Sequence, residues 1–226
     1  VLQHWLQRCR QEQLLTPRVA YGYFPCGREG NAVVVFDPGD LAAGAAASEA
    51  SRPLGRFDLP RQRSGQRYCI ADFYRDLLEG KGEGSTQRRP ADVLPMQAVT
   101  MGETASRFAQ ELFRADQYAD YLYFHGLAVQ MAEALAEWTH ARIRRELGFA
   151  DPVDMPLRDV LAQRYRGSRY SFGYPACPNV ADSRPQLDWL AADRIGLRMD
   201  ESDQLEPEQS TTALVALHSQ ARYFSA

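Results

Sequence analysis

Residues 166–178 gather the side chains that are best suited to binding a ligand. The stretch reads Arg-Gly-Ser-Arg-Tyr-Ser-Phe-Gly-Tyr-Pro-Ala-Cys-Pro, and its two prolines exclude a regular helix. Arg169 offers a rigid fork of donors for a carboxylate or a phosphate. Tyr170, Phe172 and Tyr174 offer faces for a flat ring or a cation. Two interpretations stay open: a ligand-binding surface, or a buried connection whose arginine pairs with a local acid.

The elements that must position this stretch follow from hydrophobic periodicity and from the turn residues between segments. Helices are expected over 1–15, 103–115, 117–147, 156–165 and 183–193. Strands are expected over 19–25, 32–37, 57–62, 93–101 and 197–199, while 68–73 and 210–217 are compatible with a strand or a short helix. Residues 38–55 are compatible with a surface loop or a short helix, and 79–92 has the composition of a loop. The order predicts an α+β fold: a twisted, mostly antiparallel sheet with flanking helices, forming a single domain over residues 1–226.

The longest helix expected, over 117–147, has apolar side chains that recur every three or four residues, which is typical of an amphipathic helix. Its apolar positions are Leu122, Phe124, Leu127, Ala128, Met131, Ala134, Leu135, Trp138 and Ile143. Three arginines near its end and Gly148 after it suit a helix C-terminus. Glu133 lies beside this apolar face, so it is either a solvated flanking residue or a buried acid with a partner.

Composition is that of an ordinary soluble globular protein. The chain has 226 residues, of which 45% are hydrophobic and 24% charged, and its net charge of −3 gives no reason to expect nucleic-acid binding. No apolar run approaches the length of a membrane span, so no membrane association is expected. The chain begins with Val1 and shows no signal-peptide pattern, so we expect a cytoplasmic fragment of a longer chain.

Four cysteines, Cys9, Cys26, Cys69 and Cys177, lie at no metal-ligand spacing, and the four histidines are scattered. Free thiols in a reducing cytoplasm are therefore expected, and no metal site. The sequence also contains no Walker phosphate-binding loop, no G-x-G-x-x-G fingerprint and no readable Ser-His-Asp or Cys-His arrangement.

Short motifs along nearly the whole chain resemble the activation domain of cobalamin-dependent methionine synthase. They occur in the family's order at 21–25, 30–31, 59–62, 69–73, 131–140, 165–169, 173–178, 200–202 and 221–224. The pair Tyr-Arg-Gly-Ser-Arg and Gly-Tyr-Pro-Ala-Cys-Pro is the most specific of them. Because so many motifs occur in order, we interpret the chain as a member of this family.

The resemblance implies a binding and docking module within a methyltransferase. In this family the enzyme moves a methyl group from methyltetrahydrofolate to homocysteine through cobalt, which occasionally oxidises. Reactivation takes an electron from flavodoxin or another reductase and a methyl group from S-adenosylmethionine. The activation domain, at the C-terminal end of the enzyme, binds S-adenosylmethionine and docks over the domain that binds cobalamin. The partners implied are therefore that cobalamin-binding domain and the reductase.

The resemblance also implies site residues. Arg169 would bind the methionine carboxylate of S-adenosylmethionine, and Glu133 would face its ammonium or hydroxyl groups. No residue is expected to be catalytic, because the chemistry belongs to the cobalt and the sulfonium while the protein supplies orientation and electrostatics.

Five further residues complete the implied contact set. The backbone around Ser171 and Gly173, together with Tyr174, would line the adenosine side of the ligand. Tyr223, with Phe224, would close the site near the C-terminus.

The sequence departs from the family pattern in ways that bear on function. Residues 170–172 read Tyr-Ser-Phe where Pro-Ala-Pro is usual, and 179–180 read Asn-Val where an acid-histidine pair is frequent. An acidic ligand residue of the family would fall before Val1, and no cobalamin-binding Asp-x-His-x-x-Gly motif is present. Two alternatives remain open: a stand-alone S-adenosylmethionine-binding protein with a different methyl acceptor, and a domain whose site has decayed.

Overall fold

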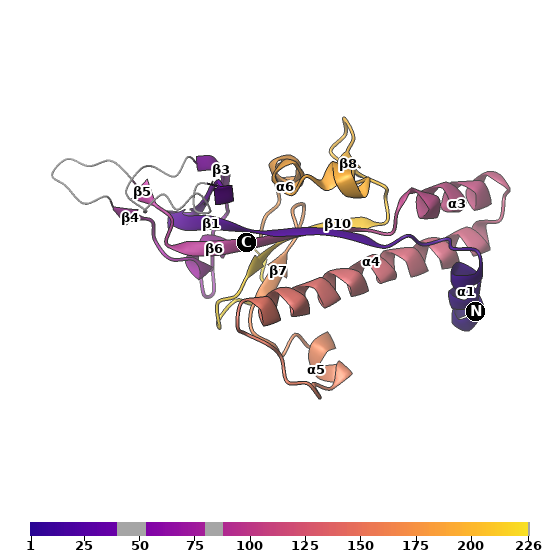
Figure 1. Ribbon diagram of the computed structural model, residues 1–226, viewed down its shortest axis with the longest axis horizontal. Helices are drawn as coiled ribbons and strands as arrows, with labels where there is room; N and C mark the ends of the chain where they lie inside the picture. The colour runs from indigo at the N-terminus through magenta and orange to yellow at the C-terminus, as the bar shows by residue number, and fades with distance from the viewer. Residues whose placement is uncertain (40–52, 80–87, 226) are drawn as a thin grey trace. The chain divides into compact units, whose positions relative to one another are not determined.

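A computed structural model describes residues 1–39, 53–79 and 88–225 (Figure 1). The helices are α1 (Leu2–Gln11), α3 (Glu103–Arg114), α4 (Tyr118–Glu146), α5 (Leu157–Leu161) and α6 (Ser183–Trp189), with short 3-10 helices η1 (Ile70–Phe73), η2 (Val180–Asp182) and η3 (Ala192–Ile195). The strands are β1 (Arg18–Glu29), β2 (Ala32–Phe36), β3 (Pro53–Asp58), β4 (Leu78–Glu79), β5 (Arg88–Arg89), β6 (Asp92–Thr100), β7 (Ser168–Tyr170), β8 (Arg198–Met199), β9 (Leu205–Glu206) and β10 (Ser210–Ala216).

The largest sheet among the described residues has the strand order β3-β2-β1-β6-β10-β7. The pairings of β1 with β2, β2 with β3 and β10 with β7 are antiparallel. β6 lies between β1 and β10, so the prediction that 93–101 forms a central strand is confirmed, and 210–217 is resolved as a strand. An α+β fold with a mostly antiparallel sheet and flanking helices is therefore confirmed.

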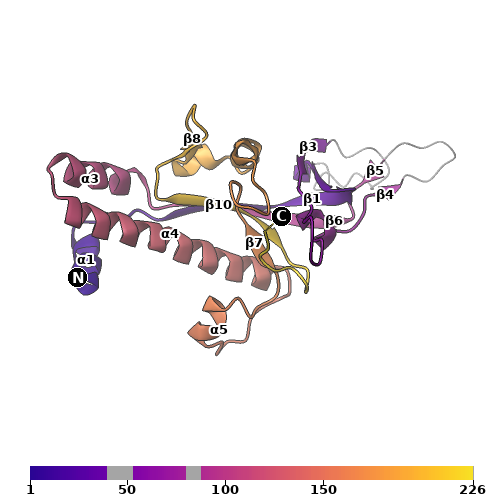
Figure 2. The same ribbon diagram turned by 180° about the vertical axis from the view of Figure 1, so that it is seen from behind.

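The chain divides into two compact units. Unit 1 comprises Val1–Tyr21, Gln97–Arg142 and Ser183–Thr212, and unit 2 comprises Gly22–Met96, Ile143–Asp182 and Ala213–Ala226. In unit 1, α1 lies with α3 and the first turns of α4, as both views show (Figures 1 and 2). Trp5 of α1 lies 5.7 Å from Phe124 of α4, and Phe108 of α3 lies 4.8 Å from the same ring, both measured between ring centroids. These aromatic contacts explain why the apolar residues of α1 recur at helical spacing.

The long helix α4 forms as predicted, and three of its predicted apolar positions are buried: Phe124, Ala128 and Ile143. Between the two large residues, the buried positions include a row of alanines that recurs every four residues: Ala128, Ala132 and Ala136. By contrast Leu122, Met131 and Trp138 are 65%, 37% and 59% exposed, so their predicted burial is wrong. Alanines let a helix pack closely, and the bulky side chains that alternate with them are then left on the outer faces.

The strand predicted over 57–62 is confirmed only at residues 57–58, since β3 begins at Pro53 and ends at Asp58. The prediction is wrong for 59–62, where the chain forms side-chain and loop contacts instead of a ladder. Gly148 ends α4 at a positive φ of 84°, and the Phe149 amide donates to the Arg144 carbonyl at 2.7 Å, which confirms the predicted glycine cap. Most of the predicted loops at 38–55 and 79–92 lie outside the described residues. Within the described part of the chain, no helix is both long and apolar enough to cross a membrane.

Candidate functional site

Arg169 lies on β7, a three-residue strand at the edge of the sheet, where the sequence predicts only an irregular connection. Val215 of β10 pairs with Arg169, and Leu214 pairs with Tyr170. Successive side chains of a strand point to opposite faces. Tyr170 is 1% exposed whereas Arg169 is half-buried, so the sheet presents the guanidinium on the face opposite the tyrosine ring.

Two arginines fix the segment that leads into β7. Arg144, at the end of α4, is buried, pairs with the Asp151 carboxylate and lies over the Tyr165 ring at 3.8 Å from its centroid. Arg166 donates its Nε–H to the Leu217 carbonyl at 2.7 Å. The backbone on which Arg169 sits is therefore fixed by charged side chains that sequence reasoning did not assign to the site.

The chain after β7 forms a tight turn closed by Cys177. The Gly173 amide donates to the Cys177 carbonyl at 3.0 Å, and the Cys177 amide donates to the Tyr174 carbonyl at 2.9 Å. The Cys177 thiol donates to the Ser171 carbonyl. Gly173 has a φ of +90°, and a Cβ there would meet the Val180 Cγ2 at 3.1 Å. Glycine is thus required at this position, and the turn presents Tyr174, 57% exposed, at its outer end.

Tyr223 lies close to this turn. Tyr223 is 48% exposed, and its pKa is raised. The largest cause is partial burial, and the nearby Cys177 and Tyr174 are smaller causes. Burial, with the charge of Asp182 as a smaller cause, raises the pKa of the Cys177 thiol to about 12. The thiol is therefore a neutral hydrogen-bond donor at physiological pH, and the two tyrosines flank it with exposed aromatic surface.

The remaining aromatic residues of the predicted site point into the interior of unit 2. Phe224 is buried and lies 5.9 Å from Tyr170 and 5.8 Å from Tyr68, between ring centroids. Phe172 is buried against Phe57 at 5.1 Å. Of the aromatic side chains in 166–178, only Tyr174 is largely exposed, and it lies on the turn. The ring of Phe224 is buried and packs in the interior of unit 2.

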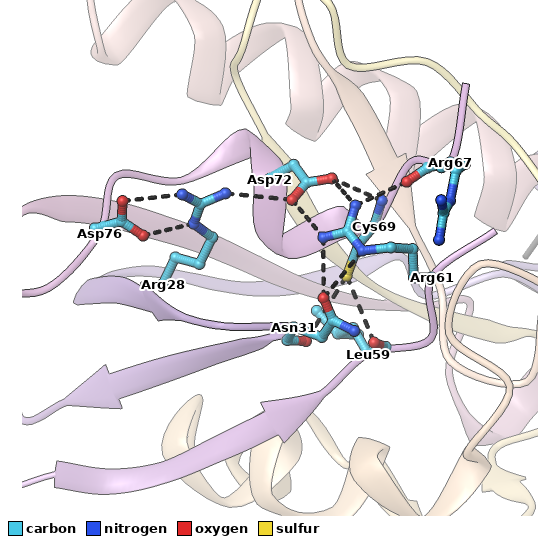
Figure 3. A network of polar contacts seen from close by, with 8 residues as sticks. All are labelled: Arg28, Asn31, Leu59, Arg61, Arg67, Cys69, Asp72 and Asp76. Carbon is cyan, nitrogen blue, oxygen red and sulfur yellow. Dashed lines mark hydrogen bonds and ion pairs between the residues drawn. The ribbon is translucent and has the colours of Figure 1, made fainter. Parts of the chain in front are cut away.

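An ion-pair network positions this aromatic interior (Figure 3). The Arg61 guanidinium binds both oxygens of Asp72, Nη1 to Oδ2 at 2.6 Å and Nη2 to Oδ1 at 2.7 Å. Arg61 also donates to the Asn31 side chain and the Arg67 carbonyl, while Arg28 reaches Asp72 at 3.3 Å. Hydrogen bonds from Arg61 are the largest cause of a lowered pKa at Asp72.

This network holds the backbone of η1 in place through Asp72. Asp72 lies within η1 and also accepts from the Cys69 amide at 3.0 Å. Phe73, the next residue, stacks on Tyr170 at 6.2 Å with an interplanar angle of 16°. Motifs 59–62 and 69–73 carried the only sequence signal for this arrangement, each with one charged residue among apolar neighbours.

Glu133 lies on α4 in unit 1, with an exposed side chain, whereas the other six residues of the predicted contact set lie in unit 2. Within unit 2 the structure brings Tyr174 and Tyr223 together around Cys177, and places Arg169 on the strand that leads into this turn. The contact of Glu133 with the same ligand stays a prediction.

Comparison with a family model and with known proteins identifies methionine synthases as the relatives of this chain. The family model for the activation domain of vitamin B12 dependent methionine synthase matches residues 2–226. Methionine synthase of Mycobacterium tuberculosis (strain ATCC 25618 / H37Rv) is 42% identical over 232 residues, and that of Mycobacterium leprae (strain TN) is 41% identical over 231. Each alignment covers 99% of this chain, and the chain spans only 18% of the length of either relative.

Among solved structures, the crystal structure of the MetH reactivation domain bound to AdoHcy is similar in fold. The TM-score is 0.81 at 23% sequence identity, and the match covers 99% of this chain and 65% of that one.

Proposed function

Because the chain belongs to the activation-domain family of vitamin B12-dependent methionine synthase, we propose that it binds S-adenosylmethionine and presents its methyl group for the reductive remethylation of oxidised cobalamin. The relatives it matches are methionine synthases, and the chain corresponds to a fraction of their length. The whole of 1–226 would act as one module of a larger methyltransferase. AdoHcy, which the fold neighbour binds, is S-adenosylmethionine without the transferred methyl group.

The observation that carries this proposal is the position of Tyr174 and Tyr223 around the Cys177 turn, beyond the strand that presents Arg169. A half-buried guanidinium suits the carboxylate of the ligand's methionine part. The exposed aromatic rings and the backbone of the Ser171–Gly173 segment suit the flat, hydrogen-bonding adenosine part. In this proposal Glu133 faces the ligand's ammonium or hydroxyl groups, and the Phe224 backbone closes the site behind Tyr223.

The chemistry would come from the ligand's sulfonium and from cobalt bound by another domain, which supplies the reduced centre that accepts the methyl group. The residues of this chain bind and orient: none of them needs to move a proton. Within the described residues no cluster of His, Cys, Asp or Glu suits a metal ion. In this proposal cobalamin is bound by the cobalamin-binding domain of the same enzyme and contacted here.

The proposal implies further partners and a compartment. Flavodoxin or another reductase would supply the electron for reactivation. The protein would work in the cytoplasm, where its four free, buried cysteines stay reduced.

Calorimetric titration with S-adenosylmethionine tests the proposal. The Arg169→Gln variant keeps a polar side chain, but it is shorter and loses the charged fork, and we expect binding to weaken by about 10- to 100-fold. Arg158→Gln is the matched control, because Arg158 is 84% exposed and its nearest acid lies at 4.0 Å. Equal affinity in Arg169→Gln and the control would refute the carboxylate role, and no binding by the unaltered chain would refute the function proposed for it.

A further inference from the structure

A concave region lies in unit 2, and none of the residues that line it belongs to the Cys177 turn. It is a cavity of about 520 Å³ bordered by η1, the start of β6, the loop after α4 and the segment after β10. Its wall includes Phe73, Arg75, Asp92, Phe149, Arg166 and His218. A volume of this size fits a small organic ligand.

The cavity lies on the Tyr170 face of β7. Phe73, in its wall, stacks on the Tyr170 ring, and side chains alternate along the strand. Arg169 therefore points to the other face of the sheet. A ligand in this cavity would not share the guanidinium that the proposed function assigns to S-adenosylmethionine.

The acids of the wall are already satisfied. Asp92 accepts from the backbone amides of Arg75 at 3.0 Å and Val93 at 2.8 Å. Asp72, also in the wall, is paired with Arg61 and Arg28. Neither carboxylate is therefore directed at a ligand cation.

The cations of the wall lack acidic partners. In the part of the chain that the structure describes, no carboxylate lies within ion-pair distance of Arg75 or Arg166. Arg166 lies over the Phe149 ring at 4.2 Å and uses only Nε in its bond to Leu217, so its two terminal nitrogens form an end-on fork. Uncompensated guanidinium groups favour an anion.

The apolar part of the wall combines the aromatic residues Phe73, Tyr74 and Phe149 with Val93, Leu147 and Leu217. Phe73 is 6% exposed, and the His218 ring stacks on it at 5.8 Å with an interplanar angle of 27°. His218 accepts from the Gln220 amide through Nδ1 at 3.2 Å, so the neutral ring carries its hydrogen on Nε2 and adds a donor. Phe73 is covered by Tyr170 and His218, so the accessible rings are the exposed His218 and Phe149, which is 37% exposed. These rings beside cationic donors suit a flat ring that carries a negative group.

We propose that this cavity is a second ligand site, which binds an aromatic ring carrying a phosphate or a carboxylate. This inference goes beyond the proposed function and does not depend on it, because the two sites use different faces of β7 and different arginines.

Fluorescence titration of this chain with 1-naphthyl phosphate tests the proposal, since this probe joins a flat ring to a dianion and lacks the sulfonium and amino acid groups of S-adenosylmethionine. We expect saturable binding at about 1 mM or tighter. The half-ligands 1-naphthol and inorganic phosphate should each bind at least about tenfold more weakly. Displacement of the probe by S-adenosylmethionine would overturn the assignment, because the probe would then occupy the Arg169 face.

Two variants locate the probe. Arg75→Gln and Arg166→Gln should each weaken 1-naphthyl phosphate binding by about tenfold. Arg164→Gln is the control: Arg164 lies two residues before Arg166, is 70% exposed and pairs with Asp159 instead of facing the cavity. Arg166 also donates to the Leu217 carbonyl, so a loss of binding in its variant can also come from a loss of structure. Arg75 has an exposed side chain, and its variant keeps the test decisive. Undiminished probe binding in Arg75→Gln with an unchanged unfolding temperature, or an equal loss in Arg164→Gln, would overturn the proposal.

Discussion

The hydroxyl of Tyr170 donates a hydrogen bond of 2.7 Å to the carbonyl of Arg222, 52 residues further along the chain. This bond joins the edge strand β7 to the C-terminal segment. Arg169 precedes the donor and Tyr223 follows the acceptor, so a single partly buried hydrogen bond holds the backbone beside two residues of the proposed S-adenosylmethionine site. Tyr170 therefore connects the positions of Arg169 and Tyr223 to the packing of the aromatic interior of unit 2.

Tyr170→Phe tests this coupling. The change removes only the hydroxyl and leaves the Arg222 carbonyl without that donor, so we expect a loss of about 1–2 kcal/mol in the free energy of unfolding. Binding of S-adenosylmethionine should weaken as well, because Tyr223 is then less well positioned. Tyr118→Phe is the control, since the Tyr118 hydroxyl donates to Asp116 in an exposed position in unit 1. If urea unfolding and calorimetry show the same small effects in both variants, the coupling does not exist.

Asp72→Asn tests the network that fixes η1. An amide cannot accept both donors of the Arg61 fork and leaves two arginines without their shared carboxylate. The Asp72 side chain is 25% exposed, so solvent screening limits the expected loss in unfolding free energy to about 1–2 kcal/mol. Asp76→Asn should cost less, because Asp76 is 70% exposed and pairs with Arg28 alone. Equal losses in the two variants would contradict a special role for Asp72.

The same carboxylate predicts a dependence of stability on pH. Arg61 lowers the pKa of Asp72 below its ordinary value of 3.8, so the unfolded chain takes up this proton more readily than the folded one. Its stabilisation is therefore complete above pH 3.8 and is lost as the pH falls further, through the lower folded pKa. The difference in unfolding free energy between the unaltered chain and Asp72→Asn should shrink below pH 3.8. Urea unfolding from pH 7 to pH 2.5 measures it, and a constant difference would disprove the linkage.

The sequence predicted the long elements well because their signals are local. α4 was expected over 117–147 and forms Tyr118–Glu146, since the three-and-four spacing extends over eight turns of helix. β7 was not predicted, because three residues are too few to show a period and its partners lie at 214–216. The buried face of α4 was predicted correctly at Phe124, Ala128 and Ile143 but wrongly at Leu122, Met131 and Trp138, because the pattern does not distinguish a row of alanines from a row of larger apolar residues.

The candidate site was predictable in its residue types but not in their roles. Arg169, Tyr174 and Tyr223 are accessible, whereas the rings of Tyr170, Phe172 and Phe224 are buried. An aromatic residue in a glycine-rich stretch suits either role, and only the alternation along β7 separates them. The supporting ion pairs join segments distant in sequence, which no local pattern reveals.

Cysteine reactivity provides an independent check of the turn. Burial raises the pKa of the Cys177 thiol from 9.0 to about 12, a difference of about 3, so at pH 8 the folded protein holds roughly a thousandfold less thiolate than the unfolded chain. Alkylation by iodoacetamide, followed by mass spectrometry, should be slower in the folded state by at least that factor. Because the folded pKa is the higher one, the stability that the neutral thiol contributes is present below pH 9.0 and declines as the pH rises above it. Equal alkylation rates with and without urea would disprove this description of Cys177.

Gly173→Ala tests the backbone of the turn, with Gly126→Ala as its counterpart. Gly173 has a φ of +90°, where a side chain is strained, and its Cβ would lie 3.1 Å from Val180, so we expect a loss of about 1–2 kcal/mol in unfolding free energy. Gly126 lies in α4, exposed and with nothing within 4 Å of its Cβ, so alanine there should add about 0.5–1 kcal/mol. The first variant should also weaken S-adenosylmethionine binding, because it displaces the amide that donates to Cys177 and the adjoining Tyr174, while the second should leave binding unchanged. Stabilisation by both alanines would mean that the turn tolerates a side chain, and the role assigned to its backbone would then be wrong.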